Sequence, residues 1–343
     1  MLSWVARFAV LGVAVPAMLL ASAYRTGPLG SWWLELLQYA PYPAFLVPAL
    51  LCVVLSCRLG WAWRLTALGA LGLVVTIVMG FAFGRADTGS GALRMMTYNI
   101  KANRTAWQQG EIEALEALVR EVARQRPDLL VMQDAGDLTA ARSNAPIAQS
   151  IFAGRNVFSH DEYIVVSRYP LRDCRAGDLS FRGRPHTYVH CIVVVDGSEI
   201  ELFTAHLLSP RHGLNATRHQ GAKGIDDWQQ NFEDRLSQSR TLAGDVAKRE
   251  HPLIVAGDLN APETSPVIRT LLERGLRDAF SSAGRGYGYT HGHATKLAIS
   301  FLRIDHILVS PEIGVVDAFA GGKEGSEHRP VIADLLLKRD DPR

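Results

Sequence analysis

The distribution of apolar and charged residues divides the chain near residue 90. Before that point lie three apolar runs without a charged side chain, at residues 8–24, 36–57 and 65–83. A helix needs about 20 apolar residues to cross the hydrocarbon core of a bilayer. The pattern therefore predicts a membrane anchor of three transmembrane helices at residues 1–84, with buried helices of a soluble core as the alternative. Pro41, Pro43 and Pro48 fall in the second run, so we expect that helix to begin irregularly and to be kinked.

The loops of this anchor predict its orientation. The connection between the second and third runs contains Arg58 and Arg64 and no acidic residue. Cytoplasmic loops are enriched in Lys and Arg, so we expect this loop inside the cell and everything after residue 83 outside it. A cleaved signal peptide is an alternative for the first run, because Ala21-Ser22-Ala23 is similar to a cleavage site. Both interpretations place the C-terminal part on the same side.

Residues 85–91 are predicted to be a flexible linker, and residues 92–343 to form one α/β domain. Helices are expected from Ile112 onward, where apolar residues recur at helical spacing, and at residues 232–248. Residues 209–227 are polar and have no strong period. Several predicted strands follow one another without a helix, which favours mixed sheets covered by helices. The predicted strands are residues 93–100, 128–132, 163–166, 189–195, 200–205, 252–256, 304–309 and 331–337.

The charges of the chain nearly balance, with 36 Lys and Arg against 34 Asp and Glu and a net charge of +2. Proteins that hold nucleic acid without sequence preference usually carry a strong basic excess, and none is present here. Two local basic clusters, at residues 182–184 and 211–219, are candidates for phosphate contacts or for ordinary surface solvation. No feature of the sequence indicates a protein partner.

Two of the four cysteines, Cys174 and Cys191, flank a predicted strand pair. An oxidising compartment would permit a disulfide between them, and two reduced cysteines are the alternative.

Polar residues follow or end many of the predicted strands. Each alone is typical of a turn or a helix cap. Together, carboxylates, carboxamides and histidines suit a cation with oxygen ligands beside acid–base groups. Paired cysteines and the His-x-x-x-His spacing of zinc sites are missing from their surroundings. These candidate residues are Asn99, Asp134, His206, Asp258, Asn260, Asp305, Glu327 and His328.

Three of these segments, in their order, resemble the endonuclease/exonuclease/phosphatase superfamily. They are Gly-Asp-Leu-Asn at 257–260, Ile-Asp-His-Ile-Leu at 304–308 and Glu-His-Arg-Pro at 327–330. The superfamily includes deoxyribonucleases, abasic-site endonucleases, neutral sphingomyelinases and inositol polyphosphate 5-phosphatases, and the resemblance covers roughly residues 93–337. It implies a four-layer α/β sandwich, in which two mixed β-sheets pack face to face with helices outside. It also implies metal-dependent hydrolysis of a phosphate ester.

The resemblance implies that Asn99 and Asp134 hold Mg²⁺ or Mn²⁺. Two positions depart from the family pattern, which usually has Glu where this chain has Asp134 and Asp where it has Glu327. One side chain is a methylene shorter and the other a methylene longer. We therefore expect the two changes to compensate, with Glu327 as a third metal ligand. A domain that has lost catalysis and serves as a binding module at the membrane surface is the alternative.

The resemblance also implies the acid–base roles. His328, oriented by Asp305, is expected to activate the attacking water, and Asp258 to share that task. Asn260 is expected to bind the phosphoryl oxygens. His206 is expected to stabilise the phosphate or to protonate the leaving group. A histidine whose pKa lies near neutrality suits either role.

The substrate is expected to be a phosphodiester, either nucleic acid or a phospholipid head group. The polar stretch at residues 209–227, with Arg211 as a substrate-binding residue, is expected to set the choice. His291 and His293 precede the Asp305 strand and are candidates to line the substrate cleft, with ordinary exposed loop histidines as the alternative. The bilayer itself is the other expected partner, through the N-terminal helices.

Overall fold

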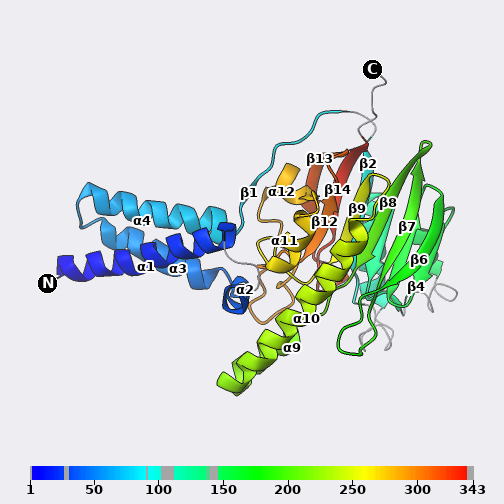
Figure 1. Cartoon of the computed structure of the whole chain (residues 1–343). Coiled ribbons are helices and arrows are strands. Elements are labelled where there is room, and N and C mark those ends of the chain that lie inside the picture. The colour runs from blue at the N-terminus through cyan, green and yellow to red at the C-terminus, as the bar shows by residue number, and fades with distance from the viewer. Residues whose placement is uncertain are drawn as a thin grey trace.

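The computed structural model contains two six-stranded sheets with helices outside them, a two-stranded sheet and an N-terminal group of helices (Figure 1). The structure describes residues 2–26, 31–89, 92–101, 112–136, 138 and 146–337. The first sheet has the order β13-β14-β2-β3-β5-β4, in which β2 and β3 are parallel and the other pairs antiparallel. Its strands are β13 (Ile313–Ala320), β14 (Val331–Leu337), β2 (Leu93–Asn99), β3 (Leu129–Gln133), β5 (Tyr163–Ser167) and β4 (Asn156–His160).

The second sheet has the order β10-β12-β9-β8-β7-β6, in which β8 and β9 are parallel. All eight predicted strands are present in the two sheets, so the prediction of mixed sheets is confirmed. The sequence pattern did not reveal β4, β6, β10 or β13. The strands of this sheet are β10 (Arg277–Asp278), β12 (Asp305–Val309), β9 (Leu253–Asp258), β8 (Ser198–Ala205), β7 (Thr187–Val195) and β6 (Leu171–Asp178).

Alternate side chains of the central strands are buried on opposite faces of each sheet. Met95 of β2 lies in the core between the two sheets, whereas its neighbour Met96 packs under the outer helices. Helices α6 (Ile112–Gln125) and α8 (Pro146–Phe152) cover the outer face of the first sheet. Helices α10 (Ala222–Val246) and α11 (Pro266–Leu272) cover that of the second sheet. The four-layer sandwich implied by the resemblance is therefore confirmed.

The N-terminal helices are compatible with two or three spans, and three were predicted. Among the described residues, two helices are long and apolar enough to cross a membrane, Ser3–Thr26 within α1 (Leu2–Thr26) and Trp61–Val78, which joins α4 (Trp61–Leu73) to the π-helical η1 (Val74–Val78). The second predicted run begins irregularly and is kinked, as expected. It takes in the end of α2 (Trp32–Gln38) and all of α3 (Pro43–Ser56), which are bent by 78° and could together make a third span. Pro41 and Pro43 explain the break, because proline removes a backbone donor and disfavours helix in the residue before it.

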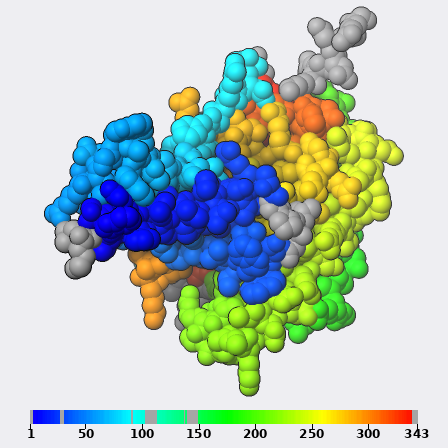
Figure 2. All heavy atoms as spheres, turned by 60° about the vertical axis from the view of Figure 1, so that its left-hand side comes forward, coloured from blue at the N-terminus to red at the C-terminus, as the bar shows by residue number. Residues whose placement is uncertain are grey.

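The last predicted run also ends earlier than expected, at Val78 instead of residue 83. Phe83 belongs to β1 (Ala82–Phe83), which pairs with β11 (Arg285–Gly286) of the α/β domain. Residues 85–89 of the predicted flexible linker are hydrogen-bonded to the domain: Arg85 N–H donates to Ser282 O and Asp87 N–H to Val315 O, both at 2.7 Å. Residues 90 and 91 lie outside the described residues. Figure 2 shows the N-terminal segment, in blue, seated against the domain.

The structure also defines the polar stretch at residues 209–227 and the state of two cysteines, neither of which the sequence pattern decided. The polar stretch at residues 209–227 forms α9 (Arg211–Gln220) and the first turns of α10, which packs closely on α9 at Gly224. A Cβ atom on Gly224 would lie 2.1 Å from the carbonyl oxygen of Ala216, so this close approach requires glycine. Cys174 and Cys191 form a disulfide that joins β6 to β7.

Candidate active site

The candidate site forms where strands of both sheets end. Asn99 is the last residue of β2 and Asp134 follows β3, so these parallel strands deliver both to one edge. His206 follows β8 and Asp258 ends β9, the parallel pair of the other sheet. Strand β12 begins at Asp305, directly opposite Asp258 in the antiparallel ladder. Packing the sheets face to face brings these two edges together.

Asp258 lies at the centre of the site. Its side chain is fully buried, and its Oδ2 accepts a hydrogen bond of 2.8 Å from the Asn99 carboxamide. The same oxygen lies 3.6 Å from Nε2 of His206 and 3.7 Å from Nε2 of His328. Asn99, His206 and His328, which lie far apart in the sequence, therefore all approach Oδ2 of Asp258.

His328 has the environment of a neutral imidazole. Its Nδ1 lies 2.9 Å from Oδ2 of Asp305. This contact holds the ring in one orientation, and the family resemblance implied the same pairing of the two residues. Burial lowers the pKa of His328 to about 4, and burial also raises the pKa of Asp305 to about 6. The ring of His291 packs against that of His328, with 4.6 Å between centroids, and burial lowers the pKa of His291 to about 3. With Nδ1 as the donor, Nε2 of His328 is left as a proton acceptor at neutral pH.

His206 has a raised pKa, in contrast to His328. Its Nδ1 lies 2.9 Å from Oε2 of Glu162, and Asp258 approaches its other nitrogen. Burial opposes the charged form of the ring, but these carboxylates outweigh it and raise the pKa of His206 to about 9. His206 is therefore an imidazolium at neutral pH, a donor and a fixed positive charge. Two histidines beside one carboxylate thus carry different protonation states, the pattern of an acid and a base.

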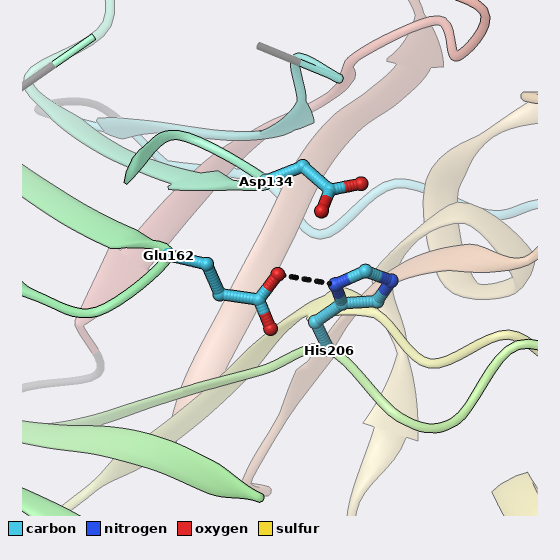
Figure 3. Close-up of side chains that lie close together, drawn as sticks. All are labelled: Asp134, Glu162 and His206. Atoms are coloured by element: carbon cyan, nitrogen blue, oxygen red, sulfur yellow. Dashed lines mark hydrogen bonds and ion pairs between the residues drawn. The ribbon is translucent and has the colours of Figure 1, made fainter. Parts of the chain in front are cut away.

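Glu162 and Lys101 belong to the site although the sequence analysis did not single them out. Figure 3 shows the carboxylates of Asp134 and Glu162 beside the His206 ring, and ligand atoms of the three residues lie within 4.8 Å of one another. Nζ of Lys101 forms an ion pair of 2.5 Å with Asp134. Burial opposes ionisation of Asp134, but His206 and Lys101 lower its pKa to about 2. Glu162 lies in the turn between β4 and β5, where the hydrophobic pattern carries no signal.

The donor set suits a hard divalent cation. Asp134 and Glu162 offer carboxylate oxygens, which Mg²⁺ and Mn²⁺ prefer, beside His206. The carboxamide oxygen of Asn99, on the neighbouring strand, accepts from the backbone N–H of Lys101 at 3.2 Å. A second close group, in which ligand atoms of Asp258, Asp305 and His328 lie within 4.8 Å of one another, is adjacent through Asp258. The residues present therefore fit the cation that the sequence predicted.

Glu327 belongs to neither of the two close groups found among the described residues. Its carboxylate lies 3.4 Å from Nη2 of Arg211, at the start of α9. The structure thus brings the predicted substrate residue and the predicted third metal ligand together as an ion pair. Glu327 as a metal ligand, and the compensation between Asp134 and Glu327, remain predictions.

Asn260 is buried beside Asp258 and adopts a left-handed backbone, with φ of 50°. Its backbone N–H donates to Oδ1 of Asp258 at 3.0 Å, and its carboxamide Nδ2 donates to Leu207 O at 2.8 Å. A non-glycine residue with positive φ is held there by its surroundings. Of the two unassigned loop histidines, His291 lies within the site, whereas His293 contacts the carbonyl oxygen of Ser326 at 3.1 Å.

Comparisons with known proteins agree with this geometry. The sequence profile of the Endonuclease/Exonuclease/phosphatase family matches residues 96–328. No curated protein matches the chain. Among solved structures, a humanized TDP2 of D. rerio has a TM-score of 0.55 at 18% identity, over 72% of this chain and all of that one. A family protein from Bacteroides thetaiotaomicron has a TM-score of 0.54 at 16% identity, over 74% and 98% of the two chains. A mannosyl-6-phosphatase of the same species has a TM-score of 0.50 at 17% identity, over 71% and 100%. At these identities the structures show a shared fold.

Proposed function

Because the chain belongs to the endonuclease/exonuclease/phosphatase family, whose members are phosphoesterases, we propose that it is a divalent-metal-dependent hydrolase of phosphate esters. The observation that carries the proposal is the approach of His206 and His328 to one oxygen of Asp258, at 3.6 and 3.7 Å. Their pKa values, about 9 and about 4, supply one proton donor and one proton acceptor at neutral pH.

The roles of the residues follow from this geometry. His328, held through Nδ1 by Asp305, accepts the proton of the attacking water, and Asp258 shares in orienting that water. His206, held by Glu162, stabilises the phosphoryl group or delivers a proton to the leaving group. Asn260 binds the phosphoryl oxygens. These donors act in a buried site, where charge–dipole interactions are stronger than in water.

The metal site of this proposal is built from Asn99, Asp134 and Glu162, with Glu327 as a further candidate. When bound there, Mg²⁺ or Mn²⁺ would neutralise charge that develops on the phosphoryl oxygens. The donor chemistry supports this assignment, because two carboxylates and a carboxamide suit a hard cation.

We further propose a phosphodiester substrate, either nucleic acid or a lipid head group, with Arg211 among the residues that bind it. The test is to assay the full-length protein in detergent against DNA, RNA, sphingomyelin, a chromogenic phosphodiester and a phosphomonoester. Turnover of a diester that requires Mg²⁺ would support the proposal. Turnover of the monoester alone would overturn the diester assignment, and binding without turnover would favour the catalytically inactive module.

We propose that the N-terminal helices anchor the chain in a membrane with the α/β domain outside the cytoplasm. Large apolar side chains exposed on these helices support contact with lipid, among them Trp4, Phe8, Val54 and Trp61. The Cys174–Cys191 disulfide favours an oxidising compartment. A reporter fused after the last residue should be active only outside the cytoplasm. A reporter active only inside would reverse the orientation.

A further inference from the structure

Helix α2 connects the N-terminal helices to the candidate active site. It lies between the first candidate span and α3, and it packs on α10 of the α/β domain (Figures 1 and 2). Nε1 of Trp228 donates to the carbonyl oxygen of Trp32 at 2.9 Å, and Thr264 donates to Gln38 at 3.1 Å. The ring of Tyr39, the residue after α2, meets that of Trp228 edge-on at 5.5 Å.

A buried ion pair lies at the centre of this contact. Nη1 of Arg235, on α10, donates to Oε1 of Glu35 at 2.9 Å, and both side chains are 0% exposed. The guanidinium also lies over the rings of Tyr39 and Trp228, at 5.4 and 5.3 Å from their centroids. Either charge left alone in this environment would be strongly unfavourable. The Glu35–Arg235 pair therefore fixes the position of α2 on the domain.

The network ends on Asn260. The hydroxyl of Tyr39 donates to the carbonyl oxygen of Asn260 at 2.7 Å, and Nη1 of Arg235 lies 3.3 Å from the same oxygen. Nη1 of Arg235 also donates to the Tyr39 hydroxyl oxygen at 2.6 Å, and Oε1 of Glu35, at 3.2 Å from the hydroxyl, is a second and more distant acceptor than Asn260 O. These contacts hold the carbonyl group of Asn260, whose backbone is left-handed. The direction of the Asn260 side chain depends on that peptide.

We infer that the segment Trp32–Tyr39 positions Asn260 for catalysis, so that docking of the N-terminal helices on the domain sets the activity of the site. Tyr39, Glu35 and Arg235 are positioning residues, because they act through Asn260 and do not touch the reacting atoms. A shift of α1 or α3 would move α2 and, through Tyr39, the Asn260 peptide. The inference rests on the proposed role of Asn260 in binding the phosphoryl group.

The test uses full-length protein in detergent, a chromogenic phosphodiester with Mg²⁺, and a thermal melt of each variant. Tyr39→Phe removes one hydroxyl and keeps the ring. It should lower kcat by about 10–100-fold, the scale expected when a catalytic group is misplaced, with a smaller change in KM. The matched control is Tyr42→Phe, whose ring stacks on Tyr289 at 6.1 Å, and it should leave kcat within about twofold.

A double-mutant cycle separates positioning from a general loss of stability. If Tyr39 acts through Asn260, Tyr39→Phe should cost little further activity in an Asn260→Ala background. An equal loss in both backgrounds would overturn the inference. Arg235→Lys is a second test of the same inference. It keeps a buried positive charge beside Glu35 but removes the guanidinium contact with Asn260. Its loss of activity should likewise be small in the Asn260→Ala background.

Failure of the inference can be told apart from failure of the proposed function. If Asn260→Ala lowers kcat while Tyr39→Phe behaves like Tyr42→Phe, the site is correct and the positioning role is wrong. If Asn260→Ala and His206→Ala both leave kcat unchanged, the proposed site itself is wrong.

Discussion

His206 and His328 approach the same carboxylate oxygen of Asp258, with Nε2 distances of 3.6 and 3.7 Å, yet their pKa values differ widely. Glu162 raises the pKa of one ring, and burial lowers that of the other. The Asn99 carboxamide donates to that oxygen as well, at 2.8 Å. This arrangement gives the two histidines different protonation states at neutral pH, from which we predict separate roles in catalysis.

Replacing either histidine should stop the chemistry while leaving the fold intact. His206→Ala and His328→Ala should each lower kcat by about 10²–10⁴-fold, the usual contribution of acid–base catalysis, with a smaller change in KM. His251→Ala is the control, because His251 lies 3.2 Å from Glu199 at a partly exposed position away from the site. Steady-state kinetics and thermal melts on the same samples provide the check. Folded variants of normal activity would show that the catalytic centre is assigned wrongly.

The pH dependence of kcat should reflect the Glu162–His206 pair. His206 is protonated up to its pKa of about 9, so activity that needs the imidazolium should persist through neutral pH and fall as pH rises past that value. Glu162→Gln removes a charge that raises this pKa, and should move the alkaline limb down by about one unit or more. Glu199→Gln, which removes the carboxylate beside His251, should leave the profile unchanged. An alkaline limb that stays in place in Glu162→Gln would contradict the role of the pair.

A buried ion network formed by Asp278, Arg303 and His306 should contribute strongly to stability at neutral pH and lose that contribution in acid. Asp278 pairs with Arg303 at 2.8 Å and His306 at 2.7 Å, and although burial opposes its ionisation, these partners lower its pKa well below the usual range. The stabilisation is complete above the unfolded pKa of about 3.9 and is lost as pH falls toward the folded value. Asp278→Asn should therefore cost about 3 kcal/mol at neutral pH, and the difference should shrink below about pH 4.

The matched control for this network is Asp334→Asn, which breaks a more exposed pair with Arg94 and should cost about 1 kcal/mol or less. Chemical denaturation at pH 7 and pH 3 measures both variants. Equal losses in the two variants at pH 7 would contradict the importance of the buried network.

Much of the α/β domain could be predicted from the sequence, because buried strands and the polar residues that follow them leave a clear pattern. Asn99, Asp258 and Asp305 were placed correctly at strand ends for this reason. Glu162 was missed because it lies in a tight turn, where an acidic residue is ordinary. Its partner His206 is 44 positions away in sequence, and only the fold brings them together.

The N-terminal segment was predicted less well, because apolar runs alone do not distinguish a helix in lipid from one docked on protein. The second run was expected to begin irregularly and to be kinked, which the 78° bend between α2 and α3 confirms, but the contact of α2 with the domain was not expected. One signal was present in the sequence: Glu35 is the only acidic residue before Asp87. A lone acid in an apolar segment needs a buried partner, and the structure supplies Arg235.

Metal dependence of phosphodiester hydrolysis by the full-length protein tests the central claim most directly. Activity toward a chromogenic phosphodiester should vanish in EDTA and return with Mg²⁺ or Mn²⁺, because Asn99, Asp134 and Glu162 offer oxygen ligands only. Asp134→Ala should raise the Mg²⁺ concentration needed for half-maximal rate, and Asp334→Ala should leave it unchanged. Undiminished hydrolysis in chelator, or an Asp134→Ala variant with a normal Mg²⁺ requirement, would contradict the account.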